Sequence, residues 1–497
     1  MMKLSRKNIG EISSAAVSKP GERLFELPEK ILQFGTGVLL RGLCDYMVND
    51  ANAKKIFNGR IVVVKSTDSG STEAFEQQDN LYTVCIRGSD NGKIVEENII
   101  CCAISRVLSA RKQWKEVLQS VHSPELKIII SNTTEVGLQL VKENVFENIP
   151  SSFAGKLLAV LYERFRYLND EQLIVIPTEL ISDNGEKLRS IIHELATFNG
   201  LGNEFLKWLA ANVKFCNSLV DRIVTKDPGE QLLDEIQQQL GYEDELLTMC
   251  EDYRLWAIEG DDEVKKILSF ATADNGAFVK PDIDIFKFLK LHLLNGTHTL
   301  SASLAYLAGF DIVKQGMEDK VFSSYVRNLM LTDIAKAIPY EIEKSEIERF
   351  AYKVLDRFSN PFLQHKWINI TLQNTMKMRN RNMPVILRYQ QLYNKSPKYM
   401  ATGFAGYLLF MKGVKKEDNT YYGRRGDEYY PINDDQAAYF YHLWNGDLSP
   451  DILIHQVLSN KDLWGEDISA FTAFRESVSE KLTEMLSHGV RNTINNI

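Results

Sequence analysis

Residues 29–50, EKILQFGTGVLLRGLCDYMVND, decide the fold of this 497-residue chain. The apolar pattern EKILQF is typical of a strand and leads into Gly35-Thr36-Gly37, after which the apolar residues have the spacing of a helix. Such a turn brings backbone N–H groups and a helix N-terminus to a pyrophosphate, and its glycines permit the close approach. Leu40 replaces the usual third glycine, and glycines in strand-to-helix turns are also required sterically without any ligand.

The first half of the chain repeats this alternation of strand and helix. Short apolar runs, EKILQFG, GRIVVVKS, LKIIISNT and QLIVIPTEL, are separated by longer helical patterns such as KLLAVLYERF. This order predicts an α/β fold with a parallel, doubly wound sheet. From about Pro281 the patterns are helical, as in KSEIERFAYKVLDRF. We therefore expect two domains, a nucleotide-binding one over residues 1–280 and a mainly helical one over residues 281–497.

Composition narrows the class of protein. The 58 basic and 66 acidic side chains give a net charge of -8, so no general attraction for nucleic acid or an anionic membrane is expected. The N-terminus lacks the apolar core of a signal peptide, and apolar runs are too short to span a bilayer, which predicts a cytoplasmic protein. The six cysteines lack the spacing of a zinc site, so we expect reduced, mostly buried thiols and metal-free chemistry.

Polar residues near the predicted strand ends supply candidates for cofactor binding. Asp68 follows the strand GRIVVVK and is placed to accept hydrogen bonds from an adenosine ribose, which favours NAD, although Lys65 and Ser66 leave a 2′-phosphate open. The alternative is a solvated loop, since Asp68 lies further along the chain than the usual acidic residue. The residues expected to bind NAD(H) are Phe34, Gly35, Thr36, Gly37, Asp68, Asn132 and Thr133.

A second group of polar residues follows the strand QLIVIPTEL. Glu179, Asp183 and Asn184 lie in TELISDNG, at the edge of the sheet where ligands bind in open α/β folds. We therefore count Asn184 among the candidate substrate contacts. Ordinary turn chemistry, which Asn-Gly and Asp-Asn-Gly supply readily, is the alternative.

The segment at residues 284–309, DIFKFLKLHLLNGTHTLSASLAYLAG, carries the candidate catalytic groups. At about 100° per residue, Lys290, Asn295 and His298 fall within an arc of roughly 140° on one side of a helix, so their side chains can converge. His292 faces the other way and is expected to pack or cap. A lysine that snorkels to the surface is the alternative for any one of these residues alone.

These residue types suit carbonyl reduction without a metal. Hydride transfer to a ketone makes an alkoxide, which needs a proton donor and hydrogen-bond donors aimed at the oxygen. A partly desolvated lysine has a lowered pKa and can exchange a proton near neutral pH. An asparagine amide donates without charge, and Asn217 in NSLVDRI is a candidate for a second such donor, with helix capping as the alternative.

The chain resembles the long-chain mannitol dehydrogenase family of polyol and sugar-acid dehydrogenases. The similarity runs through FGTGVLLRG, QQDNLYTV, SNTTEVG, SDNG, NSLVDRI, KLHLLNGTH and RFSNP, and Lys290, Asn295 and His298 meet the Lys-x4-Asn-x2-His signature. The resemblance implies an expanded Rossmann domain, a helical domain and a zinc-independent site in the cleft between them. It implies that Lys290 is the general acid/base, that Asn217 and Asn295 bind the oxyanion, and that His298 and Lys377 contact substrate.

Two departures shift the expected substrate. Polyol-oxidising members tend to have an arginine where this chain has Asn369 and an acidic residue where it has Gly260. The patterns LWAIEG, HKWINITLQNTMK and YYGRRGDEYYPINDD are instead similar to a branch that reduces the ketone of tagaturonate to altronate with NADH.

A sugar-acid substrate needs a cationic contact for its carboxylate. Lys377, Arg379 and Arg381 form the candidate cluster, with a solvated basic turn as the alternative. Fructuronate reduction, mannitol-type polyol oxidation and a non-catalytic NAD-binding role remain alternatives for the function, and the oligomeric state is open.

Overall fold

The computed structural model describes residues 1–67, 71–90, 92–133, 137–226 and 229–497. The chain divides into two compact units. Unit 1 comprises Met1–Gly88 and Ile94–Ile283, and unit 2 comprises Asp284–Ile497 with the short segment Ser89–Lys93. The division next to Ile283 lies close to the boundary expected near residue 280.

The centre of unit 1 is a parallel sheet whose six strands have the order β6-β3-β2-β7-β8-β9. All neighbouring strands are parallel. The chain builds outward from β2 through β3 to β6 and then returns to the other side of β2 for β7, so the order reverses between β2 and β7. The strands are β2 (Glu29–Phe34), β3 (Arg60–Lys65), β6 (Ile104–Ser109), β7 (Ile128–Ser131), β8 (Leu173–Pro177) and β9 (Val213–Phe215).

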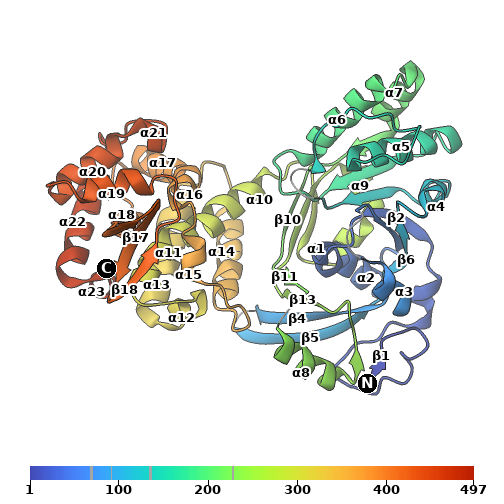
Figure 1. The fold of residues 1–497 in the computed structure, drawn as a ribbon, viewed down its shortest axis with the longest axis horizontal. Helices are drawn as coiled ribbons and strands as arrows, with labels where there is room; N and C mark the ends of the chain where they lie inside the picture. Colours follow the sequence, from blue (N-terminus) through green and yellow to red (C-terminus); the bar gives the residue numbers. More distant parts are fainter. Residues whose placement is uncertain (68–70, 91, 134–136, 227–228) are drawn as a thin grey trace. The chain divides into compact units, whose positions relative to one another are not determined.

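Helices cover both faces of this sheet because its central strands are apolar on both sides. Leu32 and Phe34 of β2 pack with α4 (Trp114–Ser120), α5 (Phe153–Tyr167), α6 (Asn184–Phe198) and α7 (Gly202–Asn212), while Ile31 packs on the opposite face with α2 (Tyr46–Ala53). Figure 1 shows α5, α6 and α7 on one side of the sheet and α1 and α2 on the other. The predicted doubly wound sheet is confirmed.

Two larger sheets, a two-stranded parallel pairing and several short elements expand unit 1. The order β11-β13-β4-β5 forms one sheet and β10-β14-β15 the other. Their strands are β4 (Tyr82–Asp90), β5 (Lys93–Cys101), β10 (Ser218–Asp221), β11 (Val224–Thr225), β13 (Thr248–Glu251), β14 (Leu255–Glu259) and β15 (Ala277–Lys280). The short elements are β1 (Met2–Lys3), η1 (Glu22–Glu26), α1 (Val38–Leu40), η2 (Arg41–Asp45), α3 (Glu73–Gln77), α8 (Glu230–Leu240), β12 (Tyr242–Glu243), α9 (Asp262–Ile267) and η4 (Ser269–Thr272).

Unit 2 is mainly helical, as predicted. Its first part contains α10 (Asp284–Phe288), the π-helix η5 (Leu289–Gly296), α11 (Thr297–Leu307), α12 (Val313–Glu318), α13 (Lys320–Asn328), the π-helix η6 (Leu329–Asp333), η7 (Ile334–Lys336) and α14 (Lys344–Phe358). Its second part contains α15 (Trp367–Ile370), α16 (Asn374–Arg381), α17 (Met383–Tyr393), α18 (Lys398–Phe410), α19 (Ala437–Trp444), α20 (Pro450–Ser459), α21 (Lys461–Trp464), α22 (Thr472–His488) and α23 (Val490–Asn495).

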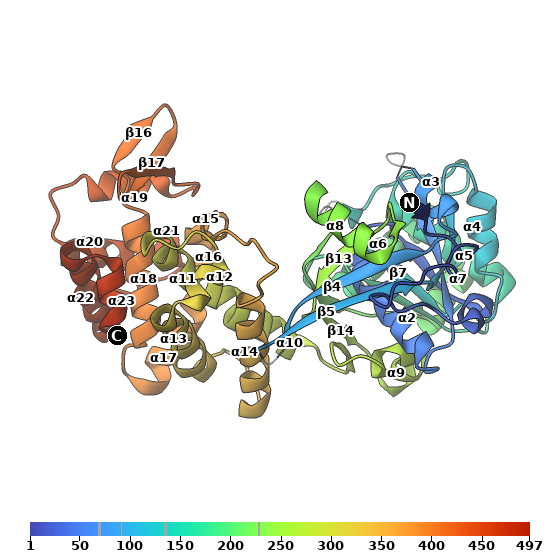
Figure 2. The same cartoon turned by 90° about the horizontal axis from the view of Figure 1, so that it is seen from below.

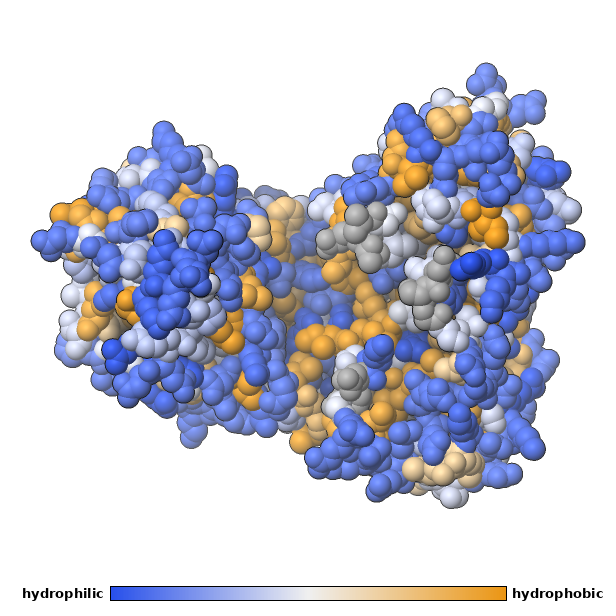
Figure 3. All heavy atoms as spheres, viewed as in Figure 1, coloured by the Kyte–Doolittle hydropathy of each residue, from blue (hydrophilic) through white to orange (hydrophobic). Residues whose placement is uncertain are grey.

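A small antiparallel sheet interrupts these helices. It contains β16 (Lys415–Glu417), β17 (Thr420–Arg425) and β18 (Glu428–Pro431), and Figure 2 shows β16 and β17 at the margin of unit 2 beside α19. Hydrophilic side chains cover most of the visible surface of unit 2 in Figure 3. Among the helices of the described ranges, none combines the length and the apolar character that a membrane span requires. The six cysteines are buried and none forms a disulfide.

Candidate functional site

The turn after β2 gives its two glycines different roles. Gly35 has a φ of +131°, and a Cβ atom there would lie 3.0 Å from the backbone oxygen of Asn132 and 2.9 Å from Cδ1 of Leu40. Gly35 is therefore required by the fold itself. Gly37, which precedes α1, has an ordinary φ of -66°, and a Cβ atom there would meet nothing within 4 Å. The open space beside Gly37 is what a close approach of a ligand to the backbone requires.

A cavity of about 560 Å³ lies where the strand order reverses between β2 and β7. Ligands of doubly wound sheets bind at this point. Five of the predicted cofactor residues line this cavity together with Lys65 and Ser66: Phe34, Gly35, Thr36, Asn132 and Thr133. The Phe34 ring is fully buried against Phe153, so Phe34 supports the floor of the cavity. Asp68 lies outside the described residues.

The buried carboxylate of Glu179 connects the ends of β7 and β8 beside this cavity. It accepts hydrogen bonds from the backbone N–H of Thr133 at 2.8 Å and from the hydroxyl of Ser131 at 3.2 Å. Burial raises the pKa of the Glu179 carboxyl, and these hydrogen bonds oppose that rise. Glu179 therefore fixes the backbone at Thr133, one of the lining residues.

The structure corrects the expectation for Asn184. Its side chain is fully buried, so it offers no surface to a substrate. Its amide nitrogen donates to the backbone oxygens of Pro177, Glu179 and Ser218, and its amide oxygen accepts from the N–H of Ser218 at 2.9 Å. Asn184 therefore joins the end of β8 to the start of β10. The sequence indicated correctly that this residue belongs to the sheet edge, but not that its polar atoms bond within the chain.

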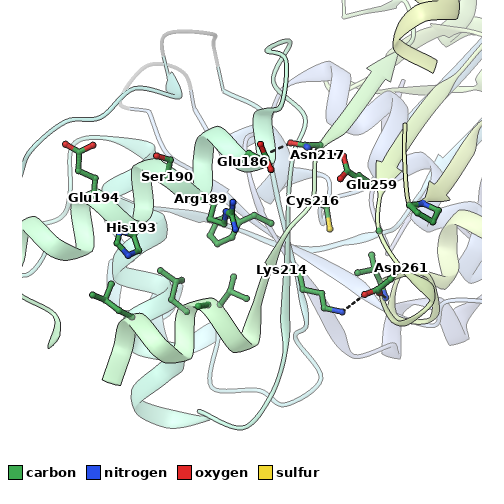
Figure 4. Close-up of a pocket in the computed structure, with 18 of the residues that line it drawn as sticks. Glu186, Arg189, Ser190, His193, Glu194, Lys214, Cys216, Asn217, Glu259 and Asp261 are labelled. Atoms are coloured by element: carbon green, nitrogen blue, oxygen red, sulfur yellow. Dashed lines mark hydrogen bonds and ion pairs between the residues drawn. The ribbon is translucent and has the colours of Figure 1, made fainter. Parts of the chain in front are cut away.

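Asn217 lies in a second cavity of unit 1, of about 980 Å³, which is lined by α6, α7, β9 and residues 259–261. Its amide oxygen accepts from the backbone N–H groups of Gly185 and Glu186 at 3.0 and 3.2 Å, and its Nδ2 donates to Oε2 of Glu259 at 3.0 Å. Figure 4 shows Asn217 between Glu186 and Glu259. Asn217 thus caps the start of α6, although it lies far from that helix in the sequence. The same contacts fix the orientation of its amide group.

In unit 2, Lys290 and Asn295 lie on the π-helix η5, not on the α-helix that the sequence spacing assumed. Hydrogen bonds in a π-helix join residues five apart, so residues at that separation lie nearly above one another. This geometry corrects the predicted arc of about 140° for the pair and brings Lys290 and Asn295 closer together on one face. Both side chains are half-buried. His298 follows in the first turn of α11.

The imidazole ring of His298 is held in its neutral form and has one ring nitrogen without a hydrogen-bond partner among the described residues. Its ring stacks on Phe358 with centroids 3.9 Å apart. Burial lowers the pKa of His298 well below its usual value, and the positive charges of Arg357, Arg381 and Lys377 lower it further. The Nε2 atom is buried and has no hydrogen-bond partner among the described residues. A neutral imidazole with a free nitrogen is suited to bind a ligand hydroxyl.

His292 has the packing and capping role expected of it. Its ring stacks on Phe288 with centroids 5.8 Å apart, and its Nδ1 lies 2.7 Å from the backbone oxygen of Arg381. Burial lowers the pKa of His292. This contact connects η5 to the C-terminal end of α16.

The predicted basic cluster divides between two sides of α16. Lys377 and Arg381 are four residues apart and share one side. Lys377 donates to the backbone oxygen of Ile370 at 3.0 Å, and burial lowers its pKa, with the charge of Arg381 adding to the effect. Arg379 is exposed on another side and donates to the backbone oxygen of Asp462. The structure therefore does not bring Arg379 together with the other two.

Sequence reasoning missed three residues of this cluster. Thr299 accepts a hydrogen bond from Arg381, while Arg357 and His365 influence the charge of His298. Thr299 is four residues after Asn295, so helical spacing was available as a signal for it. Arg357 and His365 lie in RFSNP and HKWINITLQNTMK, but no local pattern places either one beside His298.

Gly260 is packed closely against α9. A Cβ atom at Gly260 would lie only 2.6 Å from Cγ1 of Val264 in α9. An acidic side chain at this position would require α9 to move. The packing of α9 therefore leaves no room for a larger side chain at Gly260 in this structure.

Comparisons with known proteins agree with this architecture. A family model described as the mannitol dehydrogenase Rossmann domain matches residues 29–270, and one described as the mannitol dehydrogenase C-terminal domain matches residues 282–486. Proteins named altronate oxidoreductase from Halalkalibacterium halodurans and Bacteroides thetaiotaomicron are 36% and 31% identical to the chain. These alignments cover 95% and 97% of this chain and 94% and 99% of the two relatives.

Solved structures share the fold over the whole chain. Pseudomonas fluorescens mannitol 2-dehydrogenase, in a ternary complex with NAD and D-mannitol, is 21% identical with a TM-score of 0.66, over 100% of this chain and 99% of that one. A substrate-free D-sorbitol dehydrogenase is 20% identical with a TM-score of 0.77, over 99% of this chain and 100% of that one. The resemblance noted in the sequence is confirmed, and the chain belongs to the mannitol dehydrogenase family of oxidoreductases.

Proposed function

We propose that the protein is an NAD-dependent reductase that converts the ketone of tagaturonate to the alcohol of altronate, reversibly, in hexuronate breakdown. The relatives named altronate oxidoreductase, which match nearly the full chain, support this substrate. The cavity at the reversal of strand order and the NAD bound to the mannitol 2-dehydrogenase relative support the cofactor. When bound, the cofactor supplies the hydride that is added to the ketone carbon.

In the proposed reaction, residues of this chain stabilise and protonate the oxygen of the ketone as negative charge develops on it. The ammonium group of Lys290 gives its proton to the oxygen as the carbon accepts the hydride, so the product is a neutral alcohol. The amides of Asn217 and Asn295 donate hydrogen bonds to that oxygen. The orientation of Asn217 supports its role, because its amide oxygen is bound to the start of α6 and one N–H to Glu259, which leaves the second N–H to donate. His298 receives or donates a hydrogen bond at a substrate hydroxyl.

The observation that carries the preference for a sugar acid is the charge around His298. Arg357, Arg381 and Lys377 are close enough to His298 for their positive charges to add to the lowering of its pKa by burial. A neutral polyol gains little from such a positive environment. A substrate with a carboxylate gains a favourable electrostatic interaction there.

The test is the oxidation of NADH by the purified protein with tagaturonate, fructuronate and fructose measured side by side. We expect the highest kcat/KM with tagaturonate, and higher activity with NADH than with NADPH. A preference for fructuronate would assign the chain to the epimeric sugar acid, and a preference for fructose would refute the sugar-acid assignment. Tight NADH binding without turnover of any of the three would instead indicate a cofactor-binding protein without catalytic activity.

A further inference from the structure

We propose that Arg381 binds the terminal carboxylate of the substrate and thereby selects open-chain keto acids over neutral ketoses, with Thr299 as the residue that positions it. This inference rests on the proposed function and specifies which cation recognises the substrate class. It requires that the Arg381 guanidinium is available to an anion and that its position relative to Asn295 is fixed. Both conditions are met within unit 2.

The guanidinium of Arg381 has fewer hydrogen-bond partners than those of Arg60 and Arg254, which are also buried or half-buried. Its described hydrogen bonding consists of one contact, from Nη1 to the hydroxyl of Thr299 at 3.1 Å, and no carboxylate of the described residues lies within ion-pair distance. Arg60, by contrast, donates to three backbone oxygens, and Arg254 pairs with Asp274 at 2.7 Å. A guanidinium has five N–H donors, so most of those of Arg381 remain available.

Burial makes these unused donors significant. The guanidinium of Arg381 is partly removed from water, and this burial lowers its pKa. Partly desolvated cations are usually paired, because an unpaired charge away from water is costly. A carboxylate ligand would supply the missing partner, and the planar fork of arginine binds a carboxylate through two parallel hydrogen bonds.

Hydrogen bonds on both sides fix Arg381 relative to η5. The Thr299 hydroxyl, which accepts from Arg381, itself donates to the backbone oxygen of Asn295 at 2.9 Å. The backbone oxygen of Arg381 lies 2.7 Å from Nδ1 of His292, and the neighbouring Asn382 donates to the backbone oxygen of Gly296 at 3.0 Å. The guanidinium is therefore held at a set separation from Asn295, so it can select a carboxylate at a set separation from the ketone.

The other two cations of the cluster are less suitable. The ammonium group of Lys377 already donates to the backbone oxygen of Ile370, and the negative charge of Asp434 partly offsets the lowering of its pKa by burial and by Arg381. Arg379 is exposed and bonds to the backbone of Asp462. Arg379 therefore provides a matched control, since it has the same charge and lies only two residues away on the same helix.

The experiment compares kcat/KM for tagaturonate and for tagatose, the same ketose with a hydroxymethyl group in place of the carboxylate. The ratio of the two values does not depend on the fraction of the enzyme that is folded. For Arg381→Met we expect this ratio to fall about 10- to 100-fold, the usual contribution of hydrogen bonds to a charged partner. Arg379→Met should leave the ratio unchanged. Thr299→Val should lower the ratio by a smaller factor, through a higher KM for tagaturonate at nearly unchanged kcat.

The outcomes distinguish a failure of the proposed function from a failure of the role proposed for Arg381. If the wild-type enzyme does not prefer tagaturonate to tagatose, the proposed function fails. If the wild-type enzyme prefers tagaturonate and Arg381→Met retains that preference, only the role of Arg381 is overturned. Equal losses in Arg381→Met and Arg379→Met would also overturn it, because general charge would then be the cause.

Discussion

Alanine substitutions at Gly35 and Gly37 separate the steric and the ligand-binding roles of the turn after β2. Gly35→Ala forces an L-residue to a φ of +131° and places its Cβ atom 3.0 Å from the backbone oxygen of Asn132. A backbone outlier of this kind costs about 1–3 kcal/mol, and overpacking adds about 1–3 kcal/mol. We therefore expect a loss of roughly 2–6 kcal/mol, which corresponds to a fall of about 4–12 °C in the unfolding midpoint at about 2 °C per kcal/mol.

Gly37→Ala is the matched substitution in the same turn. Its φ of -66° suits alanine, and a Cβ atom there meets nothing within 4 Å. Its unfolding midpoint should therefore stay within about 2 °C of the wild-type value, since surface changes of this kind stay within about 0.5 kcal/mol. If NADH binds with its pyrophosphate against this turn, as we propose, the new methyl group obstructs that approach, and the Kd for NADH should rise about 10-fold or more.

The assay is thermal unfolding of each variant without ligand, followed by titration with NADH. The reasoning is refuted if Gly35→Ala unfolds at the wild-type temperature, or if Gly37→Ala binds NADH with unchanged affinity. A large stability loss in Gly37→Ala would also contradict it, because the structure gives that methyl group no neighbour to displace.

Three further predictions concern proton transfer, the oxyanion and a buried acid. Lys290→Ala should reduce kcat about 10²- to 10⁴-fold while sparing NADH binding; near-full turnover would exclude Lys290 as the proton donor. Asn217→Ala should reduce kcat about 100-fold. It also removes the hydrogen-bond acceptor for the backbone N–H groups of Gly185 and Glu186, so the unfolding free energy measured by urea denaturation should fall by about 1 kcal/mol. Burial raises the pKa of the Asp45 carboxyl from 3.8 to about 7 in the folded state. Between these two pH values the folded protein keeps the carboxyl protonated while the unfolded chain loses the proton. The free energy of unfolding should therefore fall as the pH rises through this range, by about 4 kcal/mol in total. Asp45→Asn should remove this part of the slope, which urea unfolding at pH 5 and pH 8 will measure; parallel curves for the two proteins would contradict the shift.

The parts of the fold that the sequence predicted are those with a local cause. β-branched runs that are apolar on both faces specify the buried strands, and the glycines after EKILQF specify the turn, so the doubly wound sheet was readable. The bonding of Asn184 and Asn217 was not readable, because their partners lie up to 42 residues away in sequence. An asparagine at a strand end has the same appearance in sequence whether its amide faces a ligand or another loop.

In the candidate site, too, the sequence predicts the features with a local cause and misses those that depend on tertiary packing. The shared side of Lys377 and Arg381 follows from their separation of four residues, and the same rule places Arg379 elsewhere, so periodicity alone was sufficient to exclude it. The unpaired nitrogen of His298 was not predictable, because it depends on Phe358 and His365, which only the tertiary fold brings to α11. Sequence therefore identified the chemical groups, and packing determined which of their atoms remain available.

The spacing of the signature residues matches the change of helix type within unit 2. Lys290 and Asn295 are five residues apart, which is the repeat of the hydrogen bond in the π-helix η5. Asn295 is followed at three and four residues by His298 and Thr299, the spacing that puts side chains on one face of an α-helix such as α11. In a continuous α-helix, Lys290 and Asn295 would stand at the two ends of the expected arc, roughly 140° apart, and their side chains would converge less closely. The π-turn, a feature that is concentrated at functional sites, is therefore what allows this sequence spacing to place an ammonium group and an amide on the same side.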